Sequence, residues 1–195
     1  SQDALPLLNK ALEIDRMCTR ATILIGDAYK SMGDVEKALD VWRRVKNQNI
    51  LHTILIVRRL MDGYEEVGRP EEGISLLKSY LAEVSSIDML DVLVKAVQKL
   101  HGAEEANALV RDELRRTPTL LGLDKLLEAQ LLVVPPEIRQ EFSNIRTLIQ
   151  RYAHKLSHYK CRHCGFEARQ FYWQCPGCHE WESYPPRRVE EESFS

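Results

Sequence analysis

Two Cys-x-x-Cys pairs near the C-terminus carry the clearest chemistry in the sequence. Cys161 pairs with Cys164 and Cys175 with Cys178, and ten residues separate the two pairs. Each pair makes a tight turn whose two sulfurs point at one ion, and two such turns complete a tetrahedral site of four thiolates. We therefore predict one bound metal ion with these four cysteines as its ligands. A disulfide-stapled or redox-active segment is the alternative, which the spacing favours less.

The residue after each pair fits the same turns. Gly165 follows the first pair, where the knuckle favours a positive φ angle and exposes backbone N–H groups to the sulfurs. His179 takes the equivalent place after the second pair, and histidine tolerates positive φ better than a bulky apolar residue does. The spacing does not specify which metal is bound.

No catalytic motif accompanies the metal site. The sequence contains no Gly-rich phosphate loop, no nucleophile elbow and no H-E-x-x-H segment. We therefore expect no catalytic residues, no organic cofactor site and no enzymatic activity. Cys18 is expected to be a small, half-buried hydrophobic residue. Because four cysteines complete the tetrahedron, the six histidines are expected to face solvent or to pack against neighbours: His52, His101, His154, His158, His163 and His179.

Aromatic residues gather around the cysteine pairs. Seven of the fourteen in the chain lie between residues 159 and 184: Tyr159, Phe166, Phe171, Tyr172, Trp173, Trp181 and Tyr184. We expect some of these rings to shield the metal and the rest to bury against helices. Stacking on single-stranded bases is the alternative, but residues 158–195 hold more Glu than Lys and Arg, and a phosphate-binding ribbon should be basic.

The composition is that of an ordinary soluble chain. The 195 residues carry a net charge of −2, which gives no electrostatic reason to expect nucleic acid as a partner. No apolar run is long enough to span a membrane, and no export signal opens the sequence. Reduced thiolates on a metal suit a cytosolic compartment.

The chain that must position the metal module is patterned as helices from residue 4 to about residue 156. Its clearest unit has the spacing of a tetratricopeptide repeat, with a period of about 34 residues: Gly26, Tyr29, Gly33, Ala38 and Trp42. Small residues let two helices approach, the aromatic rings fill the space between them, and Gly33 ends the first helix before Asp34 caps the second. This unit predicts one helical hairpin.

Neighbouring units follow at the same period. One later unit, after a one-residue insertion, contains Leu60, Tyr64, Gly68, Gly73, Leu77 and Tyr80, and a more degenerate one contains Val94, Val97, Ala106, Val110 and Pro118. The segment with Ala4, Leu8 and Ala11 reads as the second helix of a repeat whose first helix is missing. We expect this edge to fray before about residue 17 or to self-associate, because repeats bury their apolar faces on neighbours.

The predicted architecture is an all-α solenoid closed by a small metal module. The domains are a helical array over residues 1–156, a metal-binding module over 157–184 and a flexible tail over 185–195. Pro136 opens a last helix from about Glu137 to Leu156. Its apolar stripe is expected to cap the array or support the module: Phe142, Ile145, Leu148, Ile149 and Tyr152.

Together these features resemble one family. The knuckles Cys161-x-x-Cys164-Gly165 and Cys175-Pro176-x-Cys178 look like rubredoxin, although fewer residues separate them and no glycine follows the second. Tetratricopeptide repeats followed by this shortened segment, with the runs Tyr159–Phe166 and Tyr172–Cys178, resemble the lipopolysaccharide assembly protein B (LapB, YciM) family of Gram-negative bacteria. The resemblance covers essentially the whole chain.

The resemblance implies an adaptor that works with the membrane protease FtsH to promote degradation of the deacetylase LpxC. It places the full-length protein at the cytoplasmic face of the inner membrane, held by an N-terminal anchor that has no counterpart in this chain. Iron is the metal that the family usually assigns to such a site, and zinc fits the same geometry. The rival functions are rubredoxin-type electron transfer, the tetratricopeptide part of an N-acetylglucosaminyl transferase, and a nucleic-acid ribbon.

Overall fold

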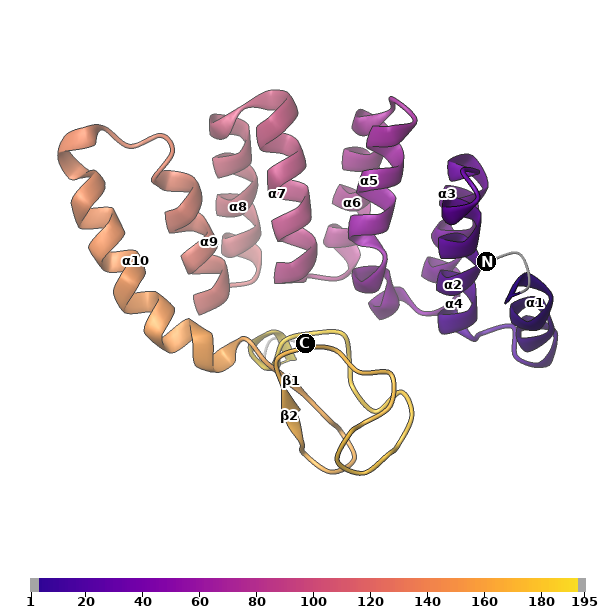
Figure 1. Ribbon diagram of the computed structural model, residues 1–195. Coiled ribbons are helices and arrows are strands. Elements are labelled where there is room, and N and C mark those ends of the chain that lie inside the picture. Colours follow the sequence, from indigo (N-terminus) through magenta and orange to yellow (C-terminus); the bar gives the residue numbers. More distant parts are fainter. Residues whose placement is uncertain (1–3, 193–195) are drawn as a thin grey trace. The chain divides into compact units, whose positions relative to one another are not determined.

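The computed structural model describes residues 4–192, which form two compact units that divide between Val84 and Ser85. Each unit is helical (Figure 1). The first contains α1 (Ala4–Ile14), α2 (Thr19–Ser31), α3 (Val35–Arg43), α4 (Val45–Gln48), the 3₁₀ segment η1 (Ile50–Leu55), α5 (Val57–Glu66) and α6 (Pro70–Glu83). The second contains α7 (Ile87–His101), α8 (Ala103–Arg116), α9 (Leu120–Gln130), α10 (Pro136–Leu156), β1 (Tyr159–Lys160), β2 (Glu167–Ala168) and α11 (Val189–Glu192).

The all-α prediction is confirmed. Within residues 4–192 the one sheet is the antiparallel pair β1 and β2, in which Tyr159 faces Ala168 and Lys160 faces Glu167. The metal module lies in the same compact unit as α7–α10. No helix of the described residues combines the length and the apolar composition that a bilayer span requires.

The predicted hairpin around Trp42 is formed by α2 and α3. Trp42 is fully buried and donates its indole N–H to the carbonyl oxygen of Ile23 at 3.2 Å. A Cβ atom on Gly26 would lie 2.2 Å from Trp42 Nε1, so only glycine permits this approach. Gly33 has a φ of +84°, and the Asp34 carboxylate accepts from the Lys37 N–H, as the predicted end and cap of the two helices require.

The connection between the first two hairpins is more elaborate than one inserted residue. The chain forms α4 and then η1, and the Asn49 side chain caps η1 by accepting from the Leu51 N–H at 3.0 Å. His52 is buried here, and its Nδ1 lies 2.5 Å from the hydroxyl oxygen of Thr19. Burial lowers the pKa of His52 below its usual value. This histidine therefore packs, as expected for a residue outside the metal site.

The second unit continues the helix pairs and ends in the long helix α10. Val97, Ala106 and Val110 are buried between α7 and α8, in agreement with the degenerate repeat read there. α10 begins at Pro136 as predicted. Its apolar stripe differs from the prediction, because Phe142 and Ile149 are half-buried whereas Ile145, Leu148 and Tyr152 are exposed. The array does not cover this face of α10.

Candidate metal centre

The four predicted ligands come together at one point of the ribbon, which we define as residues 159–186. The sulfurs of Cys161, Cys164, Cys175 and Cys178 all lie within 4.8 Å of one another. The Cys161–Cys178 and Cys164–Cys175 sulfur pairs are 3.8 and 3.6 Å apart. A tetrahedron with metal–sulfur bonds of about 2.3 Å has edges of about 3.8 Å. A disulfide would need about 2.05 Å, so the arrangement fits one tetrahedral ion.

The backbone turns around the sulfurs are those of two knuckles. The Cys164 N–H points at Cys161 Sγ at 3.5 Å, and the Gly177 N–H points at Cys175 Sγ at 3.3 Å. Gly165 and His179 close the turns with φ angles of +77° and +61°, each donating its N–H to the carbonyl oxygen of the first cysteine in its pair at 2.9 Å. Both predictions for the residues after the pairs are therefore confirmed.

Cys161 is the ligand most strongly prepared as a thiolate. It is buried, which by itself raises the pKa of a thiol, and its Sγ lies 3.2 Å from the Ser183 hydroxyl oxygen. The contact with the Ser183 side chain and the hydrogen bonds from backbone N–H groups outweigh burial and lower the pKa of Cys161 to about 6. A thiolate at neutral pH is the form that binds a metal. Sulfur-only tetrahedral sites suit zinc and iron alike.

The ribbon builds a small core from the ligands and the aromatic rings. Tyr159 and Tyr184 are buried beside Cys161 and Cys175, and the Tyr184 hydroxyl donates to the Phe166 carbonyl at 2.9 Å. Further edge-to-face contacts join Tyr159 to Phe171, Phe171 to Trp173, and Tyr172 to Tyr184. Trp181 remains exposed. The rings therefore shield the metal centre, as the sequence favoured, with Trp181 outside that core.

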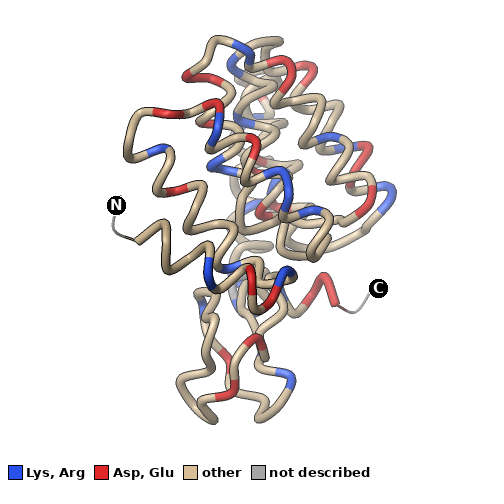
Figure 2. The backbone as a smooth tube through the Cα atoms, turned by 90° about the vertical axis from the view of Figure 1, so that its right-hand side faces the viewer, with Lys and Arg blue, Asp and Glu red and all other residues tan. Residues whose placement is uncertain are grey.

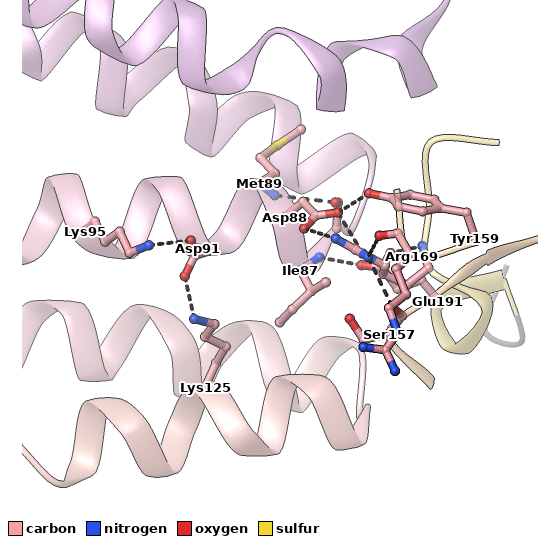
Figure 3. Close-up of polar contacts among 12 residues, drawn as sticks. Ile87, Asp88, Met89, Asp91, Lys95, Lys125, Ser157, Tyr159, Arg169 and Glu191 are labelled. Carbon is pink, nitrogen blue, oxygen red and sulfur yellow. Dashed lines mark hydrogen bonds and ion pairs between the residues drawn. The ribbon is translucent and has the colours of Figure 1, made fainter. Parts of the chain in front are cut away.

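An ion pair between two residues that are 100 positions apart in the sequence holds the end of the ribbon against α7. Arg188 donates to both oxygens of Asp88, Nε to Oδ2 at 3.0 Å and Nη2 to Oδ1 at 2.9 Å. The Tyr159 hydroxyl donates to the same carboxylate at 2.9 Å, and the Arg188 guanidinium lies 4.3 Å from the centre of the Tyr159 ring. Figure 3 shows Asp88 and Tyr159 converging where α7 begins. Burial and the neighbouring Asp88 raise the pKa of Tyr159, so its hydroxyl stays a donor.

The acidic segment after Arg188 caps two helices of the array. Glu191 is buried and accepts from the Ile87 N–H at the start of α7 and from the Arg188 N–H at 2.7 Å. Glu190 accepts from the Leu120 and Leu121 N–H groups at the start of α9. Carboxylates satisfy the open N–H groups at helix N-termini. The described part of the tail, residues 185–192, is therefore a clasp and not the flexible segment that we expected; residues 193–195 lie outside the described residues.

The other candidate residues stay apart from the metal centre. Cys18 is half-buried, as predicted, and within residues 4–192 no histidine joins the cluster of four cysteines. His158 is half-buried 3.3 Å from Glu167, whereas His101, His163 and His179 are exposed; the side chain of His154 is outside the described residues. Sequence reasoning missed Asp88, Arg188 and Glu191. The only sequence signal for Arg188 and Glu191 is the charged run after Pro186, which is equally typical of a solvated tail.

Charge is mixed over the whole of the described chain. Figure 2 shows acidic and basic positions alternating along the helices, and both signs occur in the ribbon. The ion pair between Lys160 on β1 and Glu167 on β2, 3.7 Å apart, illustrates this mixture. The ribbon thus lacks the uniformly basic surface that binding to nucleic-acid phosphates requires.

Two kinds of similarity identify the relatives of this chain. Residues 159–186 match the zinc-ribbon family model described as "Rubredoxin metal binding domain". The lipopolysaccharide assembly protein B of Escherichia coli K12 is 25% identical over 186 residues, which cover 95% of this chain and 48% of that protein. The protein of the same name from Haemophilus influenzae is 24% identical over 182 residues, covering 92% of this chain and 46% of that protein. The chain spans about half the length of these curated relatives, and it is similar to lipopolysaccharide assembly protein B over almost all of its own length, including the metal-binding ribbon.

Proposed function

We propose that this chain is the protein-binding part of a non-catalytic adaptor that regulates lipopolysaccharide assembly. The similarity to lipopolysaccharide assembly protein B over 95% of the chain is the observation that carries this proposal. The helix pairs support it, because such hairpins provide long surfaces over which many modest protein contacts can add up.

The partners that the family resemblance implies are the membrane protease FtsH and its substrate LpxC. In this scheme the adaptor holds LpxC at the protease on the cytoplasmic face of the inner membrane, and so limits the committed step of lipid A synthesis. The metal, iron or zinc, would be held by Cys161, Cys164, Cys175 and Cys178 and would cross-link the two knuckles of the ribbon. The hydrogen bonds of Tyr159 and Arg188 to Asp88 hold the ribbon against α7.

The half-life of LpxC in cells tests the proposal directly. In a strain depleted of the full-length protein, LpxC should persist, and expression of the wild-type protein should restore its degradation. Cys164→Ser/Cys178→Ser should fail to restore it, whereas the matched control Cys18→Ser, a cysteine outside the metal cluster, should succeed. An LpxC half-life that does not respond to depletion would show that the chain acts elsewhere in lipopolysaccharide assembly.

Electron transfer is the second candidate, because the ribbon matches a family model described as a rubredoxin domain. An iron-loaded protein that is reversibly bleached by a physiological reductase would support this role. Full activity of the zinc-loaded protein in the LpxC assay would exclude it, since zinc has no redox chemistry.

A further inference from the structure

The face of α10 that the array leaves open carries four large apolar side chains. Ile138, Ile145, Leu148 and Tyr152 are 39%, 48%, 57% and 66% exposed. They lie at i, i+7, i+10 and i+14, which puts them on one side of the helix. We call this row the α10 stripe. The half-buried Phe142 and Ile149 lie on the adjacent side, toward the packed face that includes Ala153. Exposed apolar side chains that follow one another along a helix are typical of a protein–protein interface.

Charges beside the α10 stripe are divided between the two halves of the helix. Glu137 and Glu141 flank its first half, and Arg151 and Lys155 flank its second half. At 100° per residue Glu141 falls within the stripe, next to Leu148 and Tyr152, and Glu137, Arg151 and Lys155 lie along the edge of the stripe that faces away from Phe142 and Ile149. Among residues 4–192 none of the four forms an ion pair, whereas Arg146 on the opposite edge pairs with Asp124 at 2.9 Å and with Glu128 at 3.2 Å. The charges along the stripe are therefore available to a partner.

We propose that the α10 stripe binds the α10 stripe of a second copy of this chain in antiparallel orientation. Because the charges along the stripe are acidic in the first half of α10 and basic in the second, two stripes are complementary only when the two copies run in opposite directions. In parallel orientation Glu137 and Glu141 would face the same residues of the partner, and like charges at close range repel. The pairing is thus an isologous interface with a twofold axis.

The spacing fixes the register of this pair. With the axis between Ile145 and Leu148, each Ile145 packs against the partner's Leu148 at the centre. Glu137 then lies beside the partner's Lys155, and Glu141 lies beside the partner's Arg151, each within about 1.5 Å along the axis. Glu141 also meets the partner's Tyr152, whose hydroxyl can donate to it. A single helix pair is at the small end of specific interfaces, so the dimer should be reversible at micromolar concentrations.

Two opposite charge-reversal variants test the proposal with the 195-residue chain. Glu137→Lys/Glu141→Lys makes the stripe basic throughout, and Arg151→Glu/Lys155→Glu makes it acidic throughout. Each variant alone should dimerise with an affinity at least about tenfold lower than that of the wild type. An equimolar mixture of the two should recover a heterodimer, because every repulsive contact becomes attractive. Sedimentation velocity over a concentration series measures the affinity, and native mass spectrometry identifies the heterodimer by its mass.

Matched variants separate this interface from other causes. Glu104→Lys/Glu105→Lys makes the same charge change in the first turn of α8, away from the stripe, and should leave dimerisation unchanged. Leu148→Gln should weaken the dimer, whereas Leu7→Gln on the exposed edge of α1 should not. A chain that stays monomeric at hundreds of micromolar, a mixture that forms no heterodimer, or a dimer lost on Leu7→Gln and not on Leu148→Gln would overturn the proposal. The LpxC assay is independent of this outcome.

Discussion

At the scale of single residues, the contact between Gly26 and Trp42 determines whether the α2–α3 hairpin can close. A Cβ on Gly26 would lie within 2.8 Å of three atoms of a fully buried indole ring, which cannot move aside. Gly26→Val should therefore destabilise the first unit by about 3 kcal/mol, the upper range for overpacking a core. Urea unfolding followed by far-UV circular dichroism measures this change. Gly33→Asn is the control, because nothing lies near that position and asparagine accepts its positive φ.

The attachment of the ribbon to α7 depends on the carboxylate of Asp88. Asp88→Asn leaves the Arg188 guanidinium without its charged partner, and the Arg188 side chain is 16% exposed. Breaking such a part-buried pair should cost about 1–3 kcal/mol. Hydrogen exchange should then speed up over residues 157–192. Asp91→Asn is a matched control on the same helix, since it removes the ion pair with Lys125 that Figure 3 shows away from the ribbon; equal loosening of the ribbon in both variants would contradict the role of Asp88.

At the scale of elements, the clasp of residues 185–192 should respond to pH through Glu191. Burial, opposed by the N–H groups of Ile87 and Arg188, raises its pKa from 4.5 to about 7. A carboxyl whose pKa is raised on folding binds more protons in the native state than in the unfolded state. Its contribution to the free energy of unfolding is therefore fully present below pH 4.5 and is lost as the pH rises through 7. The difference amounts to about 3 kcal/mol. The clasp should exchange amide hydrogens faster at pH 8 than at pH 6, after correction for intrinsic rates.

Glu191→Gln keeps the acceptor oxygen and removes the titration. In this variant the amides of the clasp should be equally protected from exchange at pH 6 and at pH 8. Glu192→Gln, which loses only the exposed pair with Arg162, should keep the pH dependence of the wild type. A wild-type pH dependence that persists in Glu191→Gln would assign the effect to another group.

At the scale of the whole molecule, the metal should stabilise the ribbon and leave most helices intact. The ribbon core is small, and two of its four buried residues are the ligands Cys161 and Cys175. Binding energy at such a site is folding energy for the module. Removal of the metal by a chelator, or Cys164→Ser, should therefore expose residues 159–184 to proteolysis while most of the helical circular dichroism remains. One metal ion per chain by elemental analysis, retained in Cys18→Ser, is the expected stoichiometry; unchanged protease resistance after metal loss would contradict a structural role.

The four clustered cysteines and most helices could be predicted from the sequence, because their signals are local. Each pair of ligands lies within four residues, so its spacing already encodes a knuckle. Gly26, which lets Trp42 approach closely, and Gly33, which has a positive φ, both stand at positions that the repeat period predicts to be small. Pro136 likewise predicted the start of α10.

The capping role of the tail and the exposure of one face of α10 could be found only from the tertiary structure. Asp88 and Arg188 are 100 residues apart, and nothing in the local pattern of either one selects the other. The Glu-rich run after Arg188 has the composition of a solvated tail, yet packing against the N-termini of α7 and α9 turns it into a cap. Periodicity likewise shows that α10 has an apolar stripe but not whether a neighbour covers it. Long-range contacts settle these questions, because burial depends on which surfaces the fold brings together.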